Sequence, residues 1–206
     1  VIDGSTNKPL GFSNGEPEAQ GKYYCSVGYG NAFGREFLDE VLKTANKCGI
    51  QITGSNLEVC PSQMEIQICN NGINAGDDSI MLKYLLAKIG EKYKYIIEWD
   101  AKPVEGDWNG SGCHVNFSTA QMREEGGYDI IMEAIRRLEM RHQEHIKVYG
   151  DDNHKRLTGK HETSSIDKFT YGVADRGSSI RIPRSTFNNK KGYFEDRRPS
   201  SSADMY

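Results

Sequence analysis

Residues 56–68 read NLEVCPSQMEIQI, in which apolar and polar side chains alternate on both sides of a proline. Pro61 and Ser62 are residues typical of turns, so the stretch predicts a β-hairpin centred on them. Cross-strand partners then have numbers that sum to a constant, which places Glu58 opposite Glu65 on one side of the pleat. The other side takes five apolar residues and is expected to be buried: Leu57, Val59, Met64, Ile66 and Ile68.

The polar side of this predicted hairpin sets two carboxylates about 5 Å apart. Such a pair is destabilising unless a positive group lies between its members, and a divalent metal ion is one such group. Asn56 and Gln67, which face each other in the same register, continue the polar side. An ordinary solvated sheet face, on which the two acids splay apart, is the alternative. The hairpin residues alone leave both interpretations open.

The overall composition argues against several classes of protein. With 206 residues, the chain suits one domain, or one and a half. Its 26 basic and 29 acidic residues give a net charge of -3, which argues against an electrostatic nucleic-acid binder. No apolar run approaches membrane-spanning length, and no targeting signal is visible. Five cysteines without a CxxC pair predict neither a disulfide framework nor a zinc site, and they fit a reducing cytosol.

The order of the expected elements favours an α+β fold. Apolar residues at helical spacing predict helices over residues 30–49, 77–93 and 128–150. Short apolar or alternating stretches predict strands over residues 22–28, 93–100 and 110–119. Helices and strands therefore do not alternate strictly, as they would in a Rossmann fold.

Two motifs that suggest cofactor or metal binding are weak. Gly28, Gly30 and Gly34 form GxGxxxG, one residue longer than the dinucleotide fingerprint and without the acidic residue that should follow, so they are interpreted as turn and packing glycines. His142 and His145 lie three positions apart on a predicted helix, a spacing that suits a metal ion. No carboxylate lies between them as in metalloproteases, and they are interpreted as packed or surface histidines.

A second polar strand face is expected in GSGCHVNFST, residues 110–119. Alternation puts His114, Asn116 and Ser118 on one side of this strand. A neutral imidazole close to two carboxylates is a mixed nitrogen and oxygen ligand set for Mg²⁺ or Mn²⁺, and Asn116 and Ser118 would then suit a nucleotide.

The C-terminal part of the chain adds groups that bind anions. Six arginines lie there: Arg156, Arg176, Arg181, Arg184, Arg197 and Arg198. Rigid guanidinium forks suit phosphate and carboxylate, and Glu195 among them is expected either to pair with an arginine or to bind metal. Together these groups predict metal-assisted phosphoryl transfer. No GxxxxGK[ST] motif is present, so the chain is not expected to be a P-loop enzyme.

Five motifs, in order and spacing, resemble the signatures of the catalytic domain of eukaryotic-type glutamine synthetases. They are NLEVCPSQMEIQI (56–68), WNGSGCHVNFST (108–119), RLTGKHETSSI (156–166), GVADRGSSIRIPR (172–184) and KKGYFEDRRPS (190–200), preceded by YYCSVG (23–28). The resemblance implies a ligase that makes L-glutamine from L-glutamate, ammonia and ATP through γ-glutamyl phosphate, with Mg²⁺ or Mn²⁺ ions.

Carried over residue by residue, the resemblance implies roles for the side chains of these motifs. The ligands of one metal ion would be Glu58 and Glu65, and those of the other His114 and Glu195. The ATP-binding residues would be Gln67, Asn116, Ser118, Arg176, Arg181 and Tyr193. The glutamate-binding residues would be Asp107, Trp108, Gly110, Arg156 and Arg197. Arg176 would steady the transferring phosphoryl group, and Glu162 would lie in a flap over the bound glutamate and shape the ammonium site.

Some positions depart from the family pattern and keep two other functions open. Asp107 stands where the family usually has Asn, and Lys160 replaces an aromatic residue. These changes leave room for a γ-glutamyl amide ligase that acts on an amine. A non-catalytic structural relative is the other alternative, but it would normally have lost ligands or guanidinium groups that this chain retains.

The resemblance also implies the architecture. We expect an α+β fold with a curved, mainly antiparallel sheet flanked by helices, and residues 1–206 forming a single catalytic domain truncated at both ends. A small β-rich domain and the first metal-binding strand would precede Val1, and without them the fragment is expected to be inactive. The family context implies a cytoplasmic, ring-shaped homo-oligomer with active sites at subunit interfaces, and neither nucleic-acid nor membrane partners.

Overall fold

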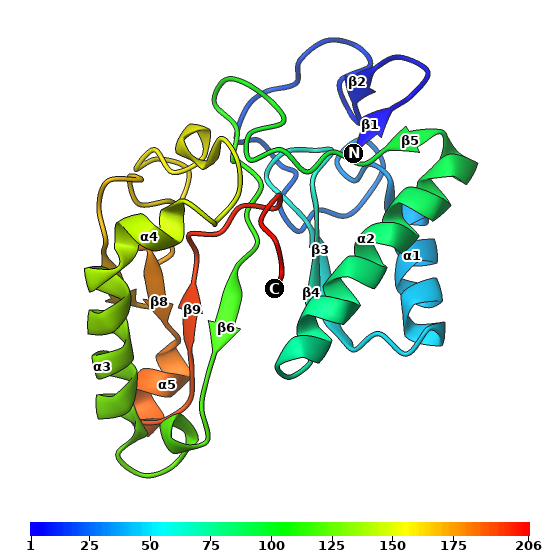
Figure 1. Cartoon of the computed structure of the whole chain (residues 1–206). Helices are drawn as coiled ribbons and strands as arrows, with labels where there is room; N and C mark the ends of the chain where they lie inside the picture. Colours follow the sequence, from blue (N-terminus) through cyan, green and yellow to red (C-terminus); the bar gives the residue numbers. More distant parts are fainter. The chain divides into compact units, whose positions relative to one another are not determined.

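The computed structural model describes residues 1–206, which form two compact units (Figure 1). Unit 1 comprises Val1–Glu98, Val104–Trp108 and Met205–Tyr206, and unit 2 comprises Trp99–Pro103 and Asn109–Asp204. No helix in either unit combines the length and the apolar character needed to cross a membrane.

Unit 1 contains two helices and five strands. In chain order these are β1 (Ile2–Asp3), β2 (Lys8–Pro9), α1 (Arg35–Lys47), β3 (Ile52–Leu57), β4 (Met64–Ile68), α2 (Ile73–Tyr93) and β5 (Tyr95–Ile96). Strands β3 and β4 form an antiparallel hairpin, and β2, β1 and β5 form a separate antiparallel sheet. The predicted hairpin over residues 56–68 is confirmed, although its first strand, β3, begins earlier, at Ile52.

Helix α1 packs its apolar side against α2. Phe37, Val41 and Ala45 recur at helical spacing and are fully buried, as their periodicity predicts. The chain leaves the helix through Gly49, whose φ of +85° is a conformation that glycine adopts without strain. At the other helix, Tyr93 donates a hydrogen bond of 2.7 Å to Glu40 of α1. The two helices are thus joined by both apolar packing and a polar contact.

Unit 2 is built on a four-stranded sheet. Its elements are β6 (Val115–Phe117), η1 (Gln121–Arg123), α3 (Gly127–Met140), α4 (His142–Ile146), η2 (Asn153–Lys155), β7 (Tyr171–Val173), β8 (Ile180–Ile182), α5 (Arg184–Asn189) and β9 (Phe194–Asp196). The strand order is β6-β9-β8-β7, antiparallel except for the parallel pair β7 and β8. Helix α3 runs beside this sheet in Figure 1.

The core of unit 2 lies between α3 and one face of the sheet. Six buried apolar residues form it: Met122, Ile131, Ile135, Ile180, Ile182 and Phe194. Because one face of the strands is buried against α3, alternation leaves their other face for polar side chains. The α+β class with mainly antiparallel strands is confirmed, although the hydrogen bonds form three separate sheets rather than one.

The register of the β3–β4 hairpin differs from the predicted one. Asn56, not Glu58, lies opposite Glu65, and the hydrogen bond from Glu58 N to Gln63 O closes a loop over residues 59–62. Glu58 and Glu65 therefore lie diagonally across the pair. They remain on the same side of the pleat, because residues 56 and 58 point the same way.

Two other predicted elements were wrong. Residues 22–28 form turns rather than a strand, and Cys25 has a φ of +50°, which no extended strand allows. The single helix predicted over residues 128–150 is divided into α3 and α4 at Arg141, whose φ of -110° and ψ of 16° are not helical. The three glycines of the GxGxxxG stretch are confirmed as turn glycines, since each has a φ near or above +70°.

Gly34, which precedes α1, allows a stability prediction. An added Cβ would lie 2.5 Å from Met64 Cε and 2.8 Å from Leu10 Cδ1, at a φ of +72°. We expect Gly34→Ala to lower the free energy of unfolding by about 3 kcal/mol, because backbone strain and overpacking add. The matched control Gly28→Ala, with a φ of +93° and no atom within 4 Å, should lose only about 1 kcal/mol. Equal losses in urea unfolding would contradict the packing role of Gly34.

Candidate active site

A row of polar residues crosses the sheet of unit 2. Asn116 of β6 pairs directly with Glu195 of β9, and Glu195 pairs directly with Arg181 of β8. Direct cross-strand partners share a side of the sheet, so these three side chains lie on the face opposite α3. The row ends at Gly172 of β7, which lies opposite Arg181 and carries no side chain.

Neighbouring positions extend this polar face. By alternation, the residues two positions from Asn116 and from Glu195 share their side. These residues are His114, Ser118, Tyr193 and Arg197. Seven of the side chains that the sequence assigns to metal, nucleotide or glutamate therefore gather on one face of one sheet, while Phe194, Ile180 and Ile182 face the core. The predicted polar face of the 110–119 strand is confirmed.

Glu195 is the centre of this face. Its carboxylate lies 3.3 Å from His114 Nδ1, 3.0 Å from Arg197 Nη1 and 2.5 Å from Arg181 Nε. Glu195 and Arg197 are both buried, so their charges are screened little by water. The expectation that Glu195 pairs with arginine is confirmed, and it pairs with two of them.

The electrostatics of the cluster favour an ionised acid beside a neutral histidine. Burial opposes the charged form of Glu195, but His114, Arg197 and Arg181 outweigh it and hold its pKa below the ordinary value. Burial lowers the pKa of His114, and the charges of Arg197 and Arg156 add to this against the opposing effect of Glu195. A carboxylate and a neutral imidazole are the forms of these groups that bind metal ions.

One buried polar atom of the cluster, Arg197 Nε, lacks a hydrogen-bond partner. Glu195 Oε2, by contrast, is paired with Arg181 Nε at 2.5 Å. Buried polar atoms are almost always satisfied, so Arg197 Nε calls for an external partner. An acceptor such as a ligand carboxylate suits it.

Ser118 and Tyr193 lie at the far end of the same face. The Ser118 hydroxyl donates a hydrogen bond of 2.7 Å to the Gly192 carbonyl and accepts one of 3.1 Å from Arg123 Nη1. Tyr193 is fixed through its backbone, which exchanges hydrogen bonds with the Thr186 hydroxyl, while its ring is 38% exposed. An exposed ring beside polar groups is the arrangement on which a flat ligand such as a base can stack.

Arg156 occupies a different environment from the other arginines. Its Nη2 donates to the carbonyl oxygens of residues 197, 198 and 199 at 3.1, 2.5 and 3.1 Å, and its Nε donates to Asn153 Oδ1 at 3.0 Å. Burial, then the charge of Arg197, lowers the pKa of Arg156 to about 10, so it stays charged at neutral pH. Arg156 thus holds the chain that follows β9.

Two glycines make room for Arg156. A Cβ on Gly110 would collide with Arg156 Cγ, and one on Gly112 would lie 2.9 Å from Arg156 Nη1 and 3.0 Å from His114 Nε2. The predicted site residue Gly110 therefore acts through close approach of its backbone to a buried arginine. Arg156 Nη1 lies beside His114, on the edge of the polar face.

The loop over residues 158–165 carries the predicted flap acid. Thr158 and Ser165 bridge its base, and the Thr163 hydroxyl hydrogen-bonds within the loop. At its tip, His161 and Glu162 have φ values of +52° and +60°, which are strained for residues with a side chain. Glu162 Oε2 lies 2.9 Å from Arg176 Nη2, and both side chains are 43% exposed.

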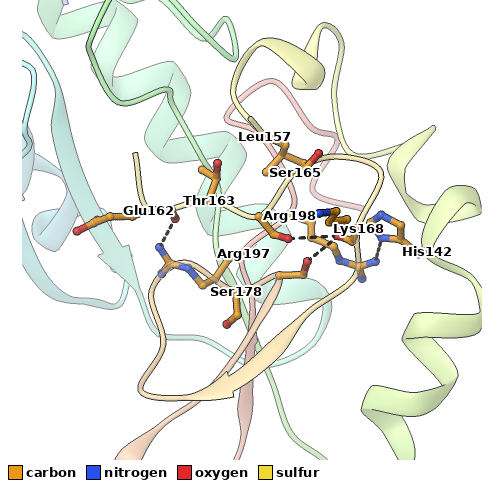
Figure 2. Close-up of a pocket in the computed structure, with 11 residues that line it drawn as sticks. His142, Leu157, Glu162, Thr163, Ser165, Lys168, Ser178, Arg197 and Arg198 are labelled. Carbon is orange, nitrogen blue, oxygen red and sulfur yellow. Dashed lines mark hydrogen bonds between the residues drawn. The ribbon is translucent and has the colours of Figure 1, made fainter. Parts of the chain in front are cut away.

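A pocket with room for about one water molecule lies under this loop. Figure 2 shows Arg197 directed toward the Glu162 backbone, whose carbonyl oxygen is 3.4 Å from Arg197 Nη2, and Arg198 directed toward His142. The flap loop, the serines at residues 178 and 179 and the chain after β9 line the pocket. The loop therefore rests on the same segment that carries Arg197.

Within unit 1, the hairpin brings its two acids into contact. Burial, followed by the hydrogen bond with Glu65 and its negative charge, raises the pKa of Glu58 to about 7, against the smaller opposing effect of its contacts with Val59 and Asn56. Gln67 donates 2.7 Å to Glu65 Oε1. The contact between the acids that the sequence predicts is confirmed, although the residue pairing that produces it is different.

Trp108 is fully buried in unit 1 and shapes its loop from inside. The indole packs with Phe12 and Tyr23, and its Nε1 donates 2.9 Å to Glu16. The exposed residue before it, Asp107, accepts a hydrogen bond from Gln20 on its backbone oxygen. Trp108 is therefore placed to set the loop conformation rather than to contact a ligand.

The predicted metal ligands fall into two pairs, one in each unit: Glu58 with Glu65, and His114 with Glu195. No group of three or more His, Cys, Asp or Glu side chains is close enough to hold a metal ion without further ligands. The chemistry of both pairs nevertheless fits Mg²⁺ or Mn²⁺, because carboxylates and a neutral imidazole are ligands that these ions accept. The contact between the two acids of the hairpin agrees with this fit, because a cation between them would relieve their repulsion.

Arg198 has a different role from the predicted one. It was expected to bind an anion with the other arginines, but its side chain is buried and its Nη2 lies 2.6 Å from Asp196 Oδ2. Strand alternation could have indicated this, because it places residues 196 and 198 together on the core side. The interpretation of His142 and His145 as packed histidines is confirmed, since Nδ1 of each contacts Arg198.

Comparison with known families gives a specific match. Residues 3–130 match the glutamine synthetase catalytic-domain family. The chain is 52% identical to a chloroplastic glutamine synthetase of Daucus carota, over 100% of this chain and 48% of the relative. It is also 52% identical to a putative glutamine synthetase of Acanthamoeba polyphaga mimivirus, over 98% of this chain and 57% of the relative.

A cytosolic glutamine synthetase isozyme of Arabidopsis thaliana is 51% identical to the chain, over 96% of this chain and 57% of the relative. The chain spans about half the length of the curated relatives that it matches.

The burial of Arg156 yields a stability prediction. We expect Arg156→Lys to lower the free energy of unfolding by about 3 kcal/mol, because an ammonium group cannot reach three carbonyls and Asn153 together. Arg176→Lys, which changes a half-exposed ion pair, should lose less than about 1 kcal/mol. Urea unfolding of the two variants measures the difference. A loss below 1 kcal/mol for Arg156→Lys would show that its carbonyl contacts are not structural.

Proposed function

The chain belongs to the glutamine synthetase family, and we propose that it catalyses the ATP-dependent ligation of ammonia to L-glutamate through γ-glutamyl phosphate. One observation carries this proposal: Glu195 lies among His114, Arg181 and Arg197 on a single polar sheet face. An acid held beside an imidazole and two guanidinium groups is suited to a cation and phosphates at the same place.

Two divalent ions would be held by the side-chain pairs described above, Glu58 with Glu65 and His114 with Glu195. Mg²⁺ or Mn²⁺ bound there would neutralise phosphate oxygens and stabilise the charge that develops during phosphoryl transfer. Each pair supplies only part of a coordination shell, so ATP, water or further carboxylates would complete it. The choice between Mg²⁺ and Mn²⁺ belongs to the same proposal.

The nucleotide would lie along the polar row. Asn116 and Ser118 offer an amide and a hydroxyl at one end, and Tyr193 is partly exposed beside them. Within unit 1, Gln67 of the hairpin is proposed as a further ATP-binding residue. Arg181 carries a positive charge in the middle of the row, next to Glu195. Arg176 lies in a half-exposed position from which its guanidinium can reach a transferring phosphoryl group once Glu162 releases it.

L-Glutamate would be oriented by Arg197, whose Nε is buried without an acceptor. Its γ-carboxylate is a poor electrophile until phosphorylated, and the acyl phosphate would hydrolyse if water entered. A loop that covers the site therefore has a chemical purpose, and Glu162 at its tip would face the ammonium ion and favour loss of its proton. Arg156 and Gly110 would support this pocket by fixing its backbone, and Asp107 and Trp108 of unit 1 are proposed as further glutamate-binding residues.

The proposal extends to the context of the protein. Residues 1–206 would act as one catalytic domain, in a ring-shaped homo-oligomer whose active sites include neighbouring subunits. We also propose a cytoplasmic location, which is the one named for the Arabidopsis isozyme, whereas the carrot relative is named chloroplastic.

A γ-glutamyl amide ligase is the second candidate, favoured by Asp107 and Lys160, which depart from the family pattern. The purified full-length protein with ATP, Mg²⁺ and glutamate should release phosphate when ammonium is added and form glutamine. Phosphate release that depends on an organic amine but not on ammonium would contradict glutamine synthesis and support the γ-glutamyl amide ligase. No release with either would favour a non-catalytic relative.

The metal ligands give a direct prediction. We expect His114→Ala and Glu65→Ala to lower kcat more than tenfold and to weaken Mn²⁺ binding, because each removes a ligand that compensates phosphate charge. The circular dichroism spectrum should stay that of the wild type. A variant that keeps more than about a tenth of kcat with normal metal dependence would contradict the assignment of that residue.

Arg197 gives a second prediction about substrate binding. We expect Arg197→Lys to raise KM for glutamate about tenfold or more while KM for ATP changes little, because a point charge cannot replace a bidentate fork. Arg184→Lys, an exposed position on α5, is the matched control and should change neither constant. Equal increases in both KM values would make Arg197 structural.

A further inference from the structure

We propose that Arg198, which would touch no substrate, is a positioning residue that fixes Glu195 and Arg197 from the opposite side of β9. The proposal rests on the function proposed above only in what those two side chains bind. It assigns a role to five side chains that the reaction does not use: Tyr149, His142, His145, Asp196 and Arg198.

The guanidinium of Arg198 is enclosed on all sides, and the residue is 1% exposed. Its Nε and Nη2 donate to the two oxygens of Asp196 at 2.9 and 2.6 Å. The rings of Tyr149 and Phe169 lie with their centroids 5.1 Å from its Cζ. The Tyr149 hydroxyl also donates 2.9 Å to Asp196 Oδ2.

The two histidines complete the enclosure. Arg198 Nη1 lies 3.1 Å from His142 Nδ1, and Nη2 lies 3.3 Å from His145 Nδ1. A guanidinium can only donate, so each Nδ1 faces Arg198 as an acceptor. His142 Nε2 accordingly donates 2.8 Å to the Ile166 carbonyl. These contacts hold the side chain of Arg198 in one place.

The enclosure reaches the active site through the backbone of β9. Asp196 Oδ1 accepts hydrogen bonds from the backbone N of Arg198 at 3.0 Å and from its Nε at 2.9 Å. The Asp196 side chain therefore bridges the backbone across Arg197, which lies between the two residues. The Arg198 carbonyl accepts from Asn153 at 2.8 Å and from Arg156. Arg197 N donates 2.9 Å to Ser179 O. The direction in which the Arg197 side chain leaves the strand is thereby fixed.

The effect on the polar face is geometric rather than electrostatic. Asp196 neutralises Arg198, and the pair lies on the core side of the strand, away from Glu195. Loosening the enclosure without removing a charge, as Tyr149→Phe does, would therefore act on the polar face only through geometry. Strand β9 could then rotate about its axis, which lengthens the contacts of Glu195 with His114 and of Arg197 with its ligand.

The test compares Arg198→Met with the wild-type protein well below its unfolding temperature. The imidazole nitrogen resonances of His114 in ligand-free protein report the contact with Glu195, and KM for glutamate reports Arg197. We expect Arg198→Met to shift the His114 resonances and to raise KM for glutamate about tenfold, as is usual when a residue that orients a ligand-binding group is removed.

Ile135→Ala is the matched control, because Ile135 is fully buried in the apolar cluster on the same side of the sheet and carries no polar group. It should lower the unfolding temperature while leaving both readouts unchanged. If Arg198→Met lowers the unfolding temperature but leaves the His114 resonances and KM unchanged, the role is structural and the proposal is wrong. The same shifts in Ile135→Ala would also overturn it.

Tyr149→Phe keeps the proposal testable if Arg198→Met does not fold, because it removes only the hydroxyl that holds Asp196. It should shift the His114 resonances in the same direction by a smaller amount, and unchanged resonances would overturn the proposal. If the wild type forms no glutamine, the proposed function fails, but the His114 resonances still decide whether Arg198 positions Glu195.

Discussion

The buried carboxylate of Glu195 is the charge around which the polar side chains of unit 2 are arranged. An isolated carboxylate removed from water costs several kcal/mol, and here His114, Arg181 and Arg197 offset that cost from three directions. The strand order β6-β9-β8 and its register bring these three partners to the face that carries Glu195. The arginines are in turn held by backbone carbonyls and by buried partners behind the sheet.

Much of this face could be predicted from the sequence, because it depends on the two-residue period of a strand. His114, Asn116 and Ser118 share a side whatever their neighbours are, and spacing alone predicted this part of the face. Tyr193, Glu195 and Arg197 were assigned through the family resemblance, because no strand was predicted over β9. The opposing hairpin acids were found by the same reasoning, but their register was not, because it depends on whether two or four residues form the turn.

The remaining features depend on contacts between distant parts of the chain. Arg156 and Arg198 look like the other arginines in the sequence, and only the folded chain shows that one caps backbone carbonyls and the other is enclosed. Residues 22–28 have the composition of a strand, yet Cys25 N bonds to the Leu57 carbonyl from a turn instead of extending a ladder. Local preference is weak against such tertiary contacts.

The alternation of β9 has a consequence for how this strand can evolve. Phe194, Asp196 and Arg198 lie on the core side, while Tyr193, Glu195 and Arg197 lie on the polar face, so a replacement at one position leaves every other side chain on its own side. A change in the length of the strand has a different effect. One inserted or deleted residue would exchange the two sides, turning Glu195 and Arg197 toward the core and Phe194 toward the polar face. Natural variants of this segment should therefore differ by replacement and never by a single-residue gap.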